Sequence, residues 1–184
     1  MNILVVIDMQ NDFVTGPLGT PEAVAIVDKI KNKIEKEDYY SLYFTRDTHS
    51  YNYLESQEGK KLPIKHCIQD TPGWCIVEDL NEYSQKAKVI NKSTFGYADW
   101  YSEFFGINLL NKTINNLTEN DKIEIVGVCT DICVISNALI LKATAPKTPI
   151  IVDASCCAGT TPEMHQKALD VMKSCQIEVI NENI

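Results

Sequence analysis

The chain has 184 residues, 45% of them hydrophobic, which is sufficient for one domain (1–184) with a buried core of its own. Its 25 acidic residues outnumber 17 basic residues and give a formal net charge of −8 at pH 7. Such a surface repels the phosphates of nucleic acids and of anionic lipids, so we expect neither a nucleic acid nor a membrane as partner.

Short runs of β-branched and aromatic residues alternate with helical segments along the chain. The runs that predict strands cover residues 3–7, 40–45, 88–90, 122–128, 149–152 and 176–180. Helix start signals, in which threonine is followed by proline and glutamate, occur at Thr20 and Thr161. This alternation predicts an α/β fold, a doubly wound open sheet of about six mainly parallel strands with helices on both faces.

Two further segments lie beside predicted strands. Residues 48–80 form a long excursion between the second and third strands. Residues 131–145 predict an apolar helix after the fourth strand, and Thr130 or Asp131 is its expected N-cap. His165, in the last predicted helix, is expected at the surface and far from the strand ends.

Leader and cysteine patterns predict the compartment. The segment MNILVVIDMQ has no basic leader, and Asp8 interrupts its apolar run. The seven cysteines have no paired CxxC spacing of the kind found in zinc ribbons or secreted disulfide frameworks. These patterns predict a cytoplasmic protein with reduced thiols.

Reactive side chains follow the ends of four predicted strands. They are Asp8, Asp47 and His49, Lys92, and Cys133, in strand order. Because ligands bind at the carboxyl ends of the strands of an open α/β sheet, we expect these side chains to share one edge and to form a site there.

Cys133 is the expected nucleophile of that site. It falls in the first turn of the helix after the fourth strand, where free backbone N–H groups favour a thiolate, and Lys92 is expected to lower its pKa further. Asp8 is the expected proton acceptor, because partial burial can make a carboxylate a competent base. The pattern predicts covalent hydrolysis of an amide.

Three segments, VVIDMQNDF, NKSTFGY and GVCTDICV, resemble in order and spacing the signature segments of the isochorismatase-like cysteine hydrolases. The resemblance covers nearly the whole chain and implies the same catalytic triad, Asp8, Lys92 and Cys133. It also implies a cis peptide between Val128 and Cys129, which turns the N–H groups of Cys129 and Cys133 into an oxyanion hole.

Within that family, the nicotinamidases carry a DxH sequence followed by a further histidine. The resemblance thus implies a metal site of Asp47, His49 and His66, with Glu58 as a fourth ligand and Glu55 as the alternative. This donor set suits a divalent metal ion, with zinc expected first and iron or manganese as alternatives.

Aromatic residues near the strand ends are expected to line the substrate pocket. Nicotinamidases often have a tryptophan before the last metal histidine, whereas this chain has Leu62 and Pro63 there. Phe13, Tyr97 and Trp100 are the residues expected to bind substrate instead.

Together these patterns predict a metal-dependent amidase, a nicotinamidase acting on a small neutral carboxamide. A related cysteine amidase acting on N-carbamoyl or ureido compounds, and a noncatalytic binding protein of the same fold, are the alternatives. Isochorismate cleavage is disfavoured because that subgroup typically lacks the cysteine. A redox pair of Cys129 and Cys133 is disfavoured by its CxxxC spacing, the other five cysteines are expected to be structural, and a homo-oligomer stays open.

Overall fold

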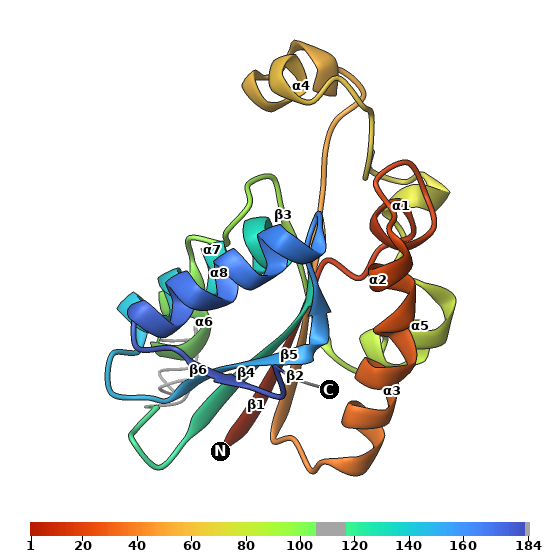
Figure 1. Ribbon diagram of the computed structural model, residues 1–184. Helices are drawn as coiled ribbons and strands as arrows, with labels where there is room; N and C mark the ends of the chain where they lie inside the picture. Colours follow the sequence, from red (N-terminus) through yellow and green to blue (C-terminus); the bar gives the residue numbers. More distant parts are fainter. Residues whose placement is uncertain (106–116, 183–184) are drawn as a thin grey trace.

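The computed structural model describes residues 1–105 and 117–182, and within them six parallel strands form one open sheet (Figure 1). The order across the sheet is β3-β2-β1-β4-β5-β6. The strands are β1 (Asn2–Ile7), β2 (Ser41–Asp47), β3 (Lys88–Lys92), β4 (Lys122–Val128), β5 (Ile150–Ala158) and β6 (Glu178–Ile180). The predicted doubly wound α/β fold is confirmed.

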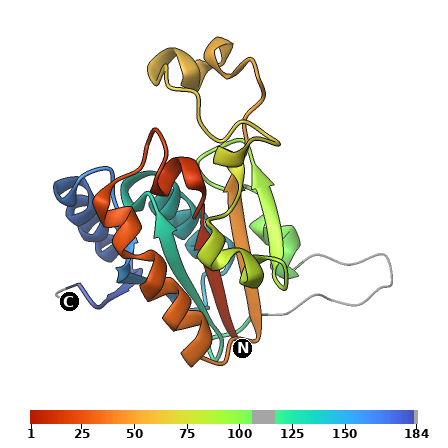
Figure 2. The ribbon, with the colours of Figure 1, turned by 90° about the vertical axis from the view of Figure 1, so that its right-hand side faces the viewer.

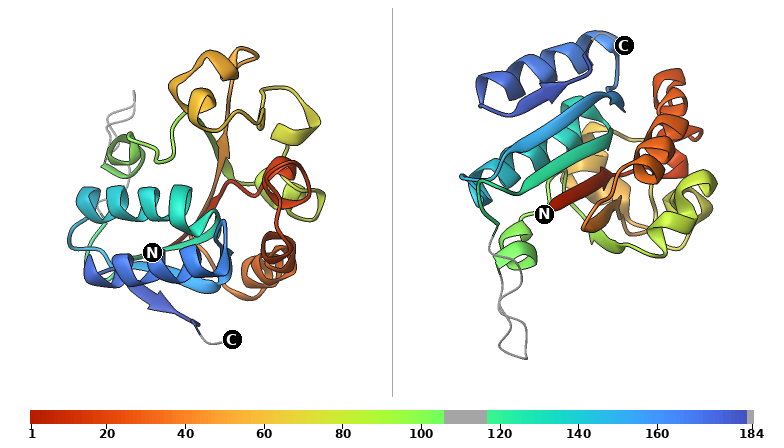
Figure 3. Two further views of the ribbon diagram at one scale, coloured as in Figure 1. Left: turned by 45° about the horizontal axis from the view of Figure 1, so that its top comes forward. Right: turned by 90° about the horizontal axis from the view of Figure 1, so that it is seen from below.

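Helices cover both faces of this sheet, as the view from below shows (Figure 3). The α-helices are α1 (Asn11–Val14), α2 (Pro21–Ala25), α3 (Val27–Lys36), α4 (Gln57–Lys61), α5 (Glu78–Ser84), α6 (Trp100–Phe105), α7 (Ile135–Thr144) and α8 (Pro162–Ser174). Shorter helical turns are η1 (Tyr53–Glu55), η2 (Pro72–Trp74) and η3 (Thr130–Val134). None of the helices in the described ranges is long and apolar enough to cross a membrane.

Alternation along β1 divides the core into two layers. Ile3, Val5 and Ile7 belong to the cluster packed against α6, α7 and α8, whereas Leu4 and Val6 belong to the cluster packed against α1, α2, α3 and α5. All five side chains are fully buried. A strand whose side chains enter a core on both faces reads as a continuous apolar run, which is why the sequence predicted it correctly.

Three strands continue past their predicted ends because the charged residues that interrupt the apolar pattern are paired. β2 ends at Asp47 and β3 at Lys92, whose side chains are 3.7 Å apart. β5 runs through Asp153, whose carboxylate lies 2.9 Å from Lys33 Nζ, and ends at Ala158. The sequence pattern shows a charged residue but not that the charge is paired in the fold. The strand ends predicted from the apolar runs were therefore too early.

The predicted start signals mark real helices. The Thr20 hydroxyl accepts a hydrogen bond from Ala23 N, and the Thr161 hydroxyl accepts one from Met164 N, at the starts of α2 and α8. The excursion after β2 contains η1, α4, η2 and the start of α5, and Figure 2 shows η1 and α4 projecting beyond the carboxyl ends of the strands.

The predicted N-cap of the helix after β4 is wrong. Cys129 occupies the N-cap position, and its side chain makes no capping hydrogen bond within the described residues. Thr130 and Asp131 instead direct their side chains to His165 and Thr160. The helix begins with η3, a π-helical turn, and continues as α7.

Candidate active site

Four strand ends bring the reactive side chains together at one edge of the sheet. Asp8 follows β1, Asp47 ends β2, Lys92 ends β3 and pairs in register with Asp47, and Cys133 lies in η3 after β4. β1 and β4 are neighbours at the point where the order of the strands reverses. The predicted common edge is confirmed, and it lies where open α/β sheets bind ligands.

Asp8, Lys92 and Cys133 form a buried cluster. Lys92 Nζ lies 2.6 Å from Asp8 Oδ2 and 3.7 Å from Cys133 Sγ. The Thr45 hydroxyl donates to Asp8 Oδ1 at 2.6 Å and accepts from the Asp8 N–H at 3.2 Å. Asp8 has a φ of 50°, an uncommon backbone conformation for a residue with a side chain. The carboxylate is thus fixed by its backbone, a hydroxyl and an ammonium.

Burial sets the protonation of this cluster. Burial and the adjacent Asp8 carboxylate raise the pKa of Cys133 well above its usual value, although Lys92 opposes the rise. Burial likewise raises the pKa of Asp8 against the opposing effect of Lys92. The expectation that the helix start gives this thiol a low pKa is therefore wrong in direction, whereas the expected lowering of the pKa by Lys92 is present but outweighed by burial. The thiol is protonated at rest and needs a base beside it.

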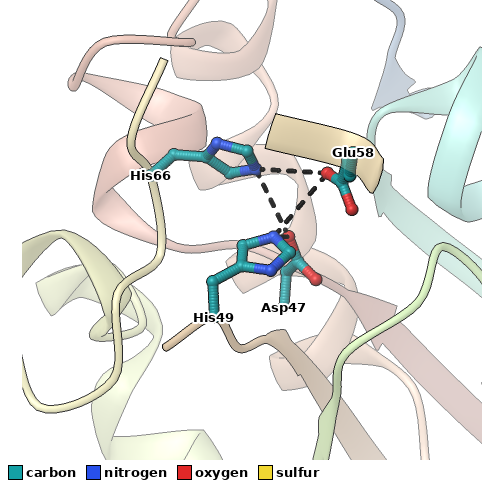
Figure 4. A group of neighbouring side chains, drawn as sticks. All are labelled: Asp47, His49, Glu58 and His66. Carbon is teal, nitrogen blue, oxygen red and sulfur yellow. Dashed lines mark ion pairs between the residues drawn. The ribbon is translucent and has the colours of Figure 1, made fainter. Parts of the chain in front are cut away.

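A second cluster holds the predicted metal ligands. Figure 4 shows that Asp47, His49, Glu58 and His66 turn toward one another, with one ligand atom of each lying within 4.8 Å of the others. Asp47 Oδ2 lies 2.8 Å from His49 Nε2 and 3.5 Å from His66 Nε2. Glu58 Oε1 lies 3.7 Å from His49 Nε2, whereas Glu55 is exposed on η1.

This donor set fits a divalent metal ion. Burial alone would raise the pKa of Asp47, but the imidazoles of His49 and His66 and the Lys92 ammonium lower it well below the usual value of an aspartate. His66 Nδ1 lies 2.8 Å from the Ile64 carbonyl, which leaves its Nε2 directed at the cluster. Two imidazoles and two carboxylates in this arrangement suit zinc, iron or manganese.

Gln10, which sequence reasoning missed, holds the strand that carries Asp47. Its side chain is fully buried and bonds both backbone groups of Asp47, accepting from the N–H at 2.7 Å and donating to the carbonyl at 2.9 Å. It also donates to the Trp74 carbonyl at 2.9 Å. The signal in the sequence was the position of Gln10, a polar residue two places after Asp8 and just past the end of β1.

Lys92 and a shared cavity connect the two clusters. Lys92 Nζ lies 3.7 Å from Asp47 Oδ1, so the ammonium faces a residue of each cluster. A cavity of about 980 Å³ opens onto the site. It is lined by side chains of both clusters, Cys133, Asp47, His49, His66 and Glu58, and by Phe13, Phe95, Tyr53, Leu62, Ile132, Cys129 and Thr160 among others.

The expected pocket aromatics are only partly placed in this cavity. Phe13 lines it and packs against His66, with ring centroids 5.4 Å apart. Trp100 instead is fully buried in the core, stacks on Phe104 and donates to Asn137 Oδ1. Tyr97 packs edge-on against Trp100, away from the lining residues. The prediction for Tyr97 and Trp100 is wrong.

Phe95 is the aromatic residue of the NKSTFGY segment that lines the cavity, and its side chain is 46% exposed. It lies closer to Lys92 in the chain than Tyr97 does. The loop turns toward the core after Phe95, where Asn137 holds it by donating to the Phe95 carbonyl and accepting from Tyr97 N. The order of the aromatic residues in the sequence does not predict where this loop turns toward the core.

The remaining expectations concern cysteines and His165. The peptide between Val128 and Cys129 is cis. All seven cysteines lie in the described ranges and are free thiols.

His165 is half-buried, with Nδ1 2.7 Å from Thr130 Oγ1, so the expectation of a surface residue far from the strand ends is wrong.

Comparisons with known proteins agree with this geometry. A family model described as the isochorismatase domain matches residues 2–183. The nicotinamidase of Saccharomyces cerevisiae is 26% identical over 217 residues, covering 99% of this chain and 100% of the relative. The nicotinamidase/pyrazinamidase of Mycobacterium tuberculosis is 26% identical over 188 residues, covering 98% of each chain.

A solved structure of the pyrazinamidase of Pyrococcus horikoshii in complex with zinc superposes with a TM-score of 0.74 at 26% identity, covering 98% of each chain. The pyrazinamidase/nicotinamidase of Streptococcus mutans superposes with a TM-score of 0.75 at 25% identity, covering 98% of this chain and all of the other. With the family model matching nearly every residue, the chain belongs to the isochorismatase family.

Proposed function

We propose that this protein is a metal-dependent nicotinamidase, which hydrolyses nicotinamide to nicotinate and ammonia through a thioester on Cys133. The observation that carries the proposal is one cavity lined by both the nucleophile and the metal-ligand cluster. Relatives that cover nearly all of the chain and are described as nicotinamidases support the substrate.

The first chemical step starts from the neutral thiol. Asp8 takes the proton of Cys133, and the thiolate attacks the carboxamide carbon to form a tetrahedral oxyanion. The N–H groups of Cys129 and Cys133 stabilise that oxygen, and each such donor contributes about 3 kcal/mol. Lys92, at 2.6 Å from Asp8, keeps the carboxylate charged until it accepts the proton.

Breakdown of this species cleaves the carbon–nitrogen bond. Asp8 returns the proton to the leaving nitrogen, so that ammonia departs and a thioester remains on Cys133. Water then attacks the thioester while Asp8 takes one of its protons. The carbon–sulfur bond breaks, the proton on Asp8 restores the thiol, and the product leaves as nicotinate after the remaining proton of the attacking water passes to solvent.

Asp47, His49, His66 and Glu58 would hold the metal. A metal ion bound there would supply a Lewis acid for orienting the pyridine ring of the substrate. We expect zinc in this site. Phe13 and Phe95 line the same cavity, and we expect their side chains to flank the pyridine ring.

The test is ammonia release from nicotinamide by zinc-loaded protein. Cys133→Ala should reduce kcat/KM by about 1,000-fold or more, because it removes the nucleophile. Cys75→Ala, at an exposed cysteine outside the cavity lining, is the matched control and should retain full activity. Turnover that survives Cys133→Ala would contradict the proposal.

The same assay separates the alternatives. Faster ammonia release from N-carbamoyl compounds than from nicotinamide would reassign the substrate while keeping the triad. A zinc-loaded protein that releases no ammonia from any amide of the panel would instead indicate a noncatalytic binding protein.

A further inference from the structure

Two side-chain contacts tie the turn that carries Cys133 to α8 and to the loop between β5 and α8. Thr130 Oγ1, on a fully buried residue, lies 2.7 Å from His165 Nδ1. Asp131 Oδ1 accepts from the Thr160 N–H at 2.8 Å, and Oδ2 accepts from the Thr160 hydroxyl at 2.6 Å. The first two residues of η3 thus bond across to another element instead of capping their own helix.

The loop between β5 and α8 also packs closely against η3 and the first turn of α8. A Cβ atom at Gly159 would lie 2.8 Å from His165 N and 2.9 Å from Asp131 Oδ1, too close for either neighbour to stay in place. α8 itself is firmly held, because Thr161 caps its start and Ala168, Leu169 and Met172 are buried in the core. It therefore provides a rigid support for η3.

The position of η3 matters for the chemistry. Cys133 lies in this turn, and its sulfur is 3.7 Å from Lys92 Nζ. The N–H groups proposed to stabilise the oxyanion belong to the same turn and to Cys129 before it. Thr160 also lines the cavity, so the contact between Asp131 and Thr160 lies at the wall of the site. A small shift of η3 would move thiol and amides together.

We propose that the Thr130–His165 and Asp131–Thr160 contacts form a latch that holds η3 in its reactive position. Thr130, Asp131, Thr160 and His165 are then positioning residues for Cys133. This inference rests on the proposed function for its kinetic readout. The alternative is that the contacts only stabilise the fold.

Thr130→Val removes the hydroxyl at nearly constant shape and should reduce kcat by about 10- to 100-fold, because small misplacements of reacting groups have effects of this size. KM and the zinc dissociation constant should stay within about twofold, since the metal ligands come from the end of β2 and from the segment that follows it, not from η3. Thr130→Ser, which keeps the hydroxyl, should restore activity. Thr144→Val, at the far end of α7, is the matched control and should behave as the wild type.

The alkylation rate of Cys133 by iodoacetamide, followed by mass spectrometry, tests the latch independently of turnover. It should fall by about tenfold in Thr130→Val, because the sulfur moves away from Asp8 and Lys92. An alkylation rate and kcat equal to wild type would overturn the inference, as would equal losses in Thr130→Ser and Thr130→Val. If the wild-type protein releases no ammonia, the proposed function fails while the alkylation comparison still decides on the latch.

A second variant covers the case in which Thr130→Val does not fold. His165→Leu removes the partner of Thr130 at a half-buried position and should give the same losses of kcat and of alkylation rate. The double variant Thr130→Val/His165→Leu should lose no more activity than either single variant, because each substitution removes the same contact. Additive losses in the double variant would contradict the pairing of Thr130 with His165.

Discussion

At Cys133 the surroundings keep the sulfur protonated and supply the group that removes the proton. Burial and Asp8 both raise the pKa of the thiol, and Asp8 is itself a buried carboxylate with a raised pKa. The position of Cys133 at a helix start predicts a low thiol pKa, but burial reverses that direction. Desolvation depends on how many neighbours cover a side chain, and that number was not available from the sequence.

Glu58 and Glu55 offer a direct test of the metal site. Glu58→Gln should weaken zinc binding by about tenfold or more, because Glu58 Oε1 lies 3.7 Å from His49 Nε2 and completes the cluster. Glu55→Gln removes the same charge at an exposed position and should leave the zinc dissociation constant within about twofold. Competition with a chromophoric chelator measures both. Equal weakening by the two variants would show that only net charge matters.

The positions of the strands explain which site residues could be predicted from the sequence. Asp8 follows β1, Asp47 and Lys92 are the last residues of β2 and β3, and parallel strands carry their carboxyl ends to one edge. Trp100 was predicted to line the pocket, although it is a core residue of α6. The direction of a loop after its strand ends depends on distant hydrogen bonds, here those of Asn137, which no local pattern contains.

Gln10 joins three elements, and its contribution can be measured through metal affinity. Gln10→Met keeps the length of the side chain but removes its three hydrogen bonds to Asp47 and Trp74, so zinc affinity should fall by about 10- to 100-fold. Asn11→Ala removes an exposed bond to the Pro72 carbonyl in the same region and is the control. Zinc affinities that match in the two variants would show that Gln10 does not position Asp47.

The whole sheet also depends on a charge network apart from the site. Lys33 of α3 lies 2.6 Å from Glu124 Oε1 on β4 and 2.9 Å from Asp153 Oδ2 on β5. Burial alone would raise the pKa of Asp153, but the hydrogen bonds from Lys33 and Ser155 lower it below its usual value. An aspartate of this kind stabilises the fold above the unfolded pKa of 3.8, and that stability is lost as the pH falls through the lower folded pKa.

Lys33→Met should remove the cation shared by two buried carboxylates and reduce the free energy of unfolding by about 3–5 kcal/mol at pH 7. Without that cation the carboxylates gain protons more easily, so the difference from wild type should shrink between pH 7 and pH 4. Denaturant titrations at several pH values measure this. Lys167→Met, whose ion pair with Glu163 is exposed, should have little effect. A difference that does not change with pH would contradict the network.

The strand order has a consequence for how the site is assembled. β1 pairs with β4 in a register that joins Ile3 to Ile123, although most of the chain separates them. Because β1 and β4 are far apart in the sequence, their pairing must first restrict a long intervening segment, and this entropy cost makes the pairing slow. Asp8 follows β1 and Cys133 follows β4, so the return of activity during refolding should report on the pairing of these two strands.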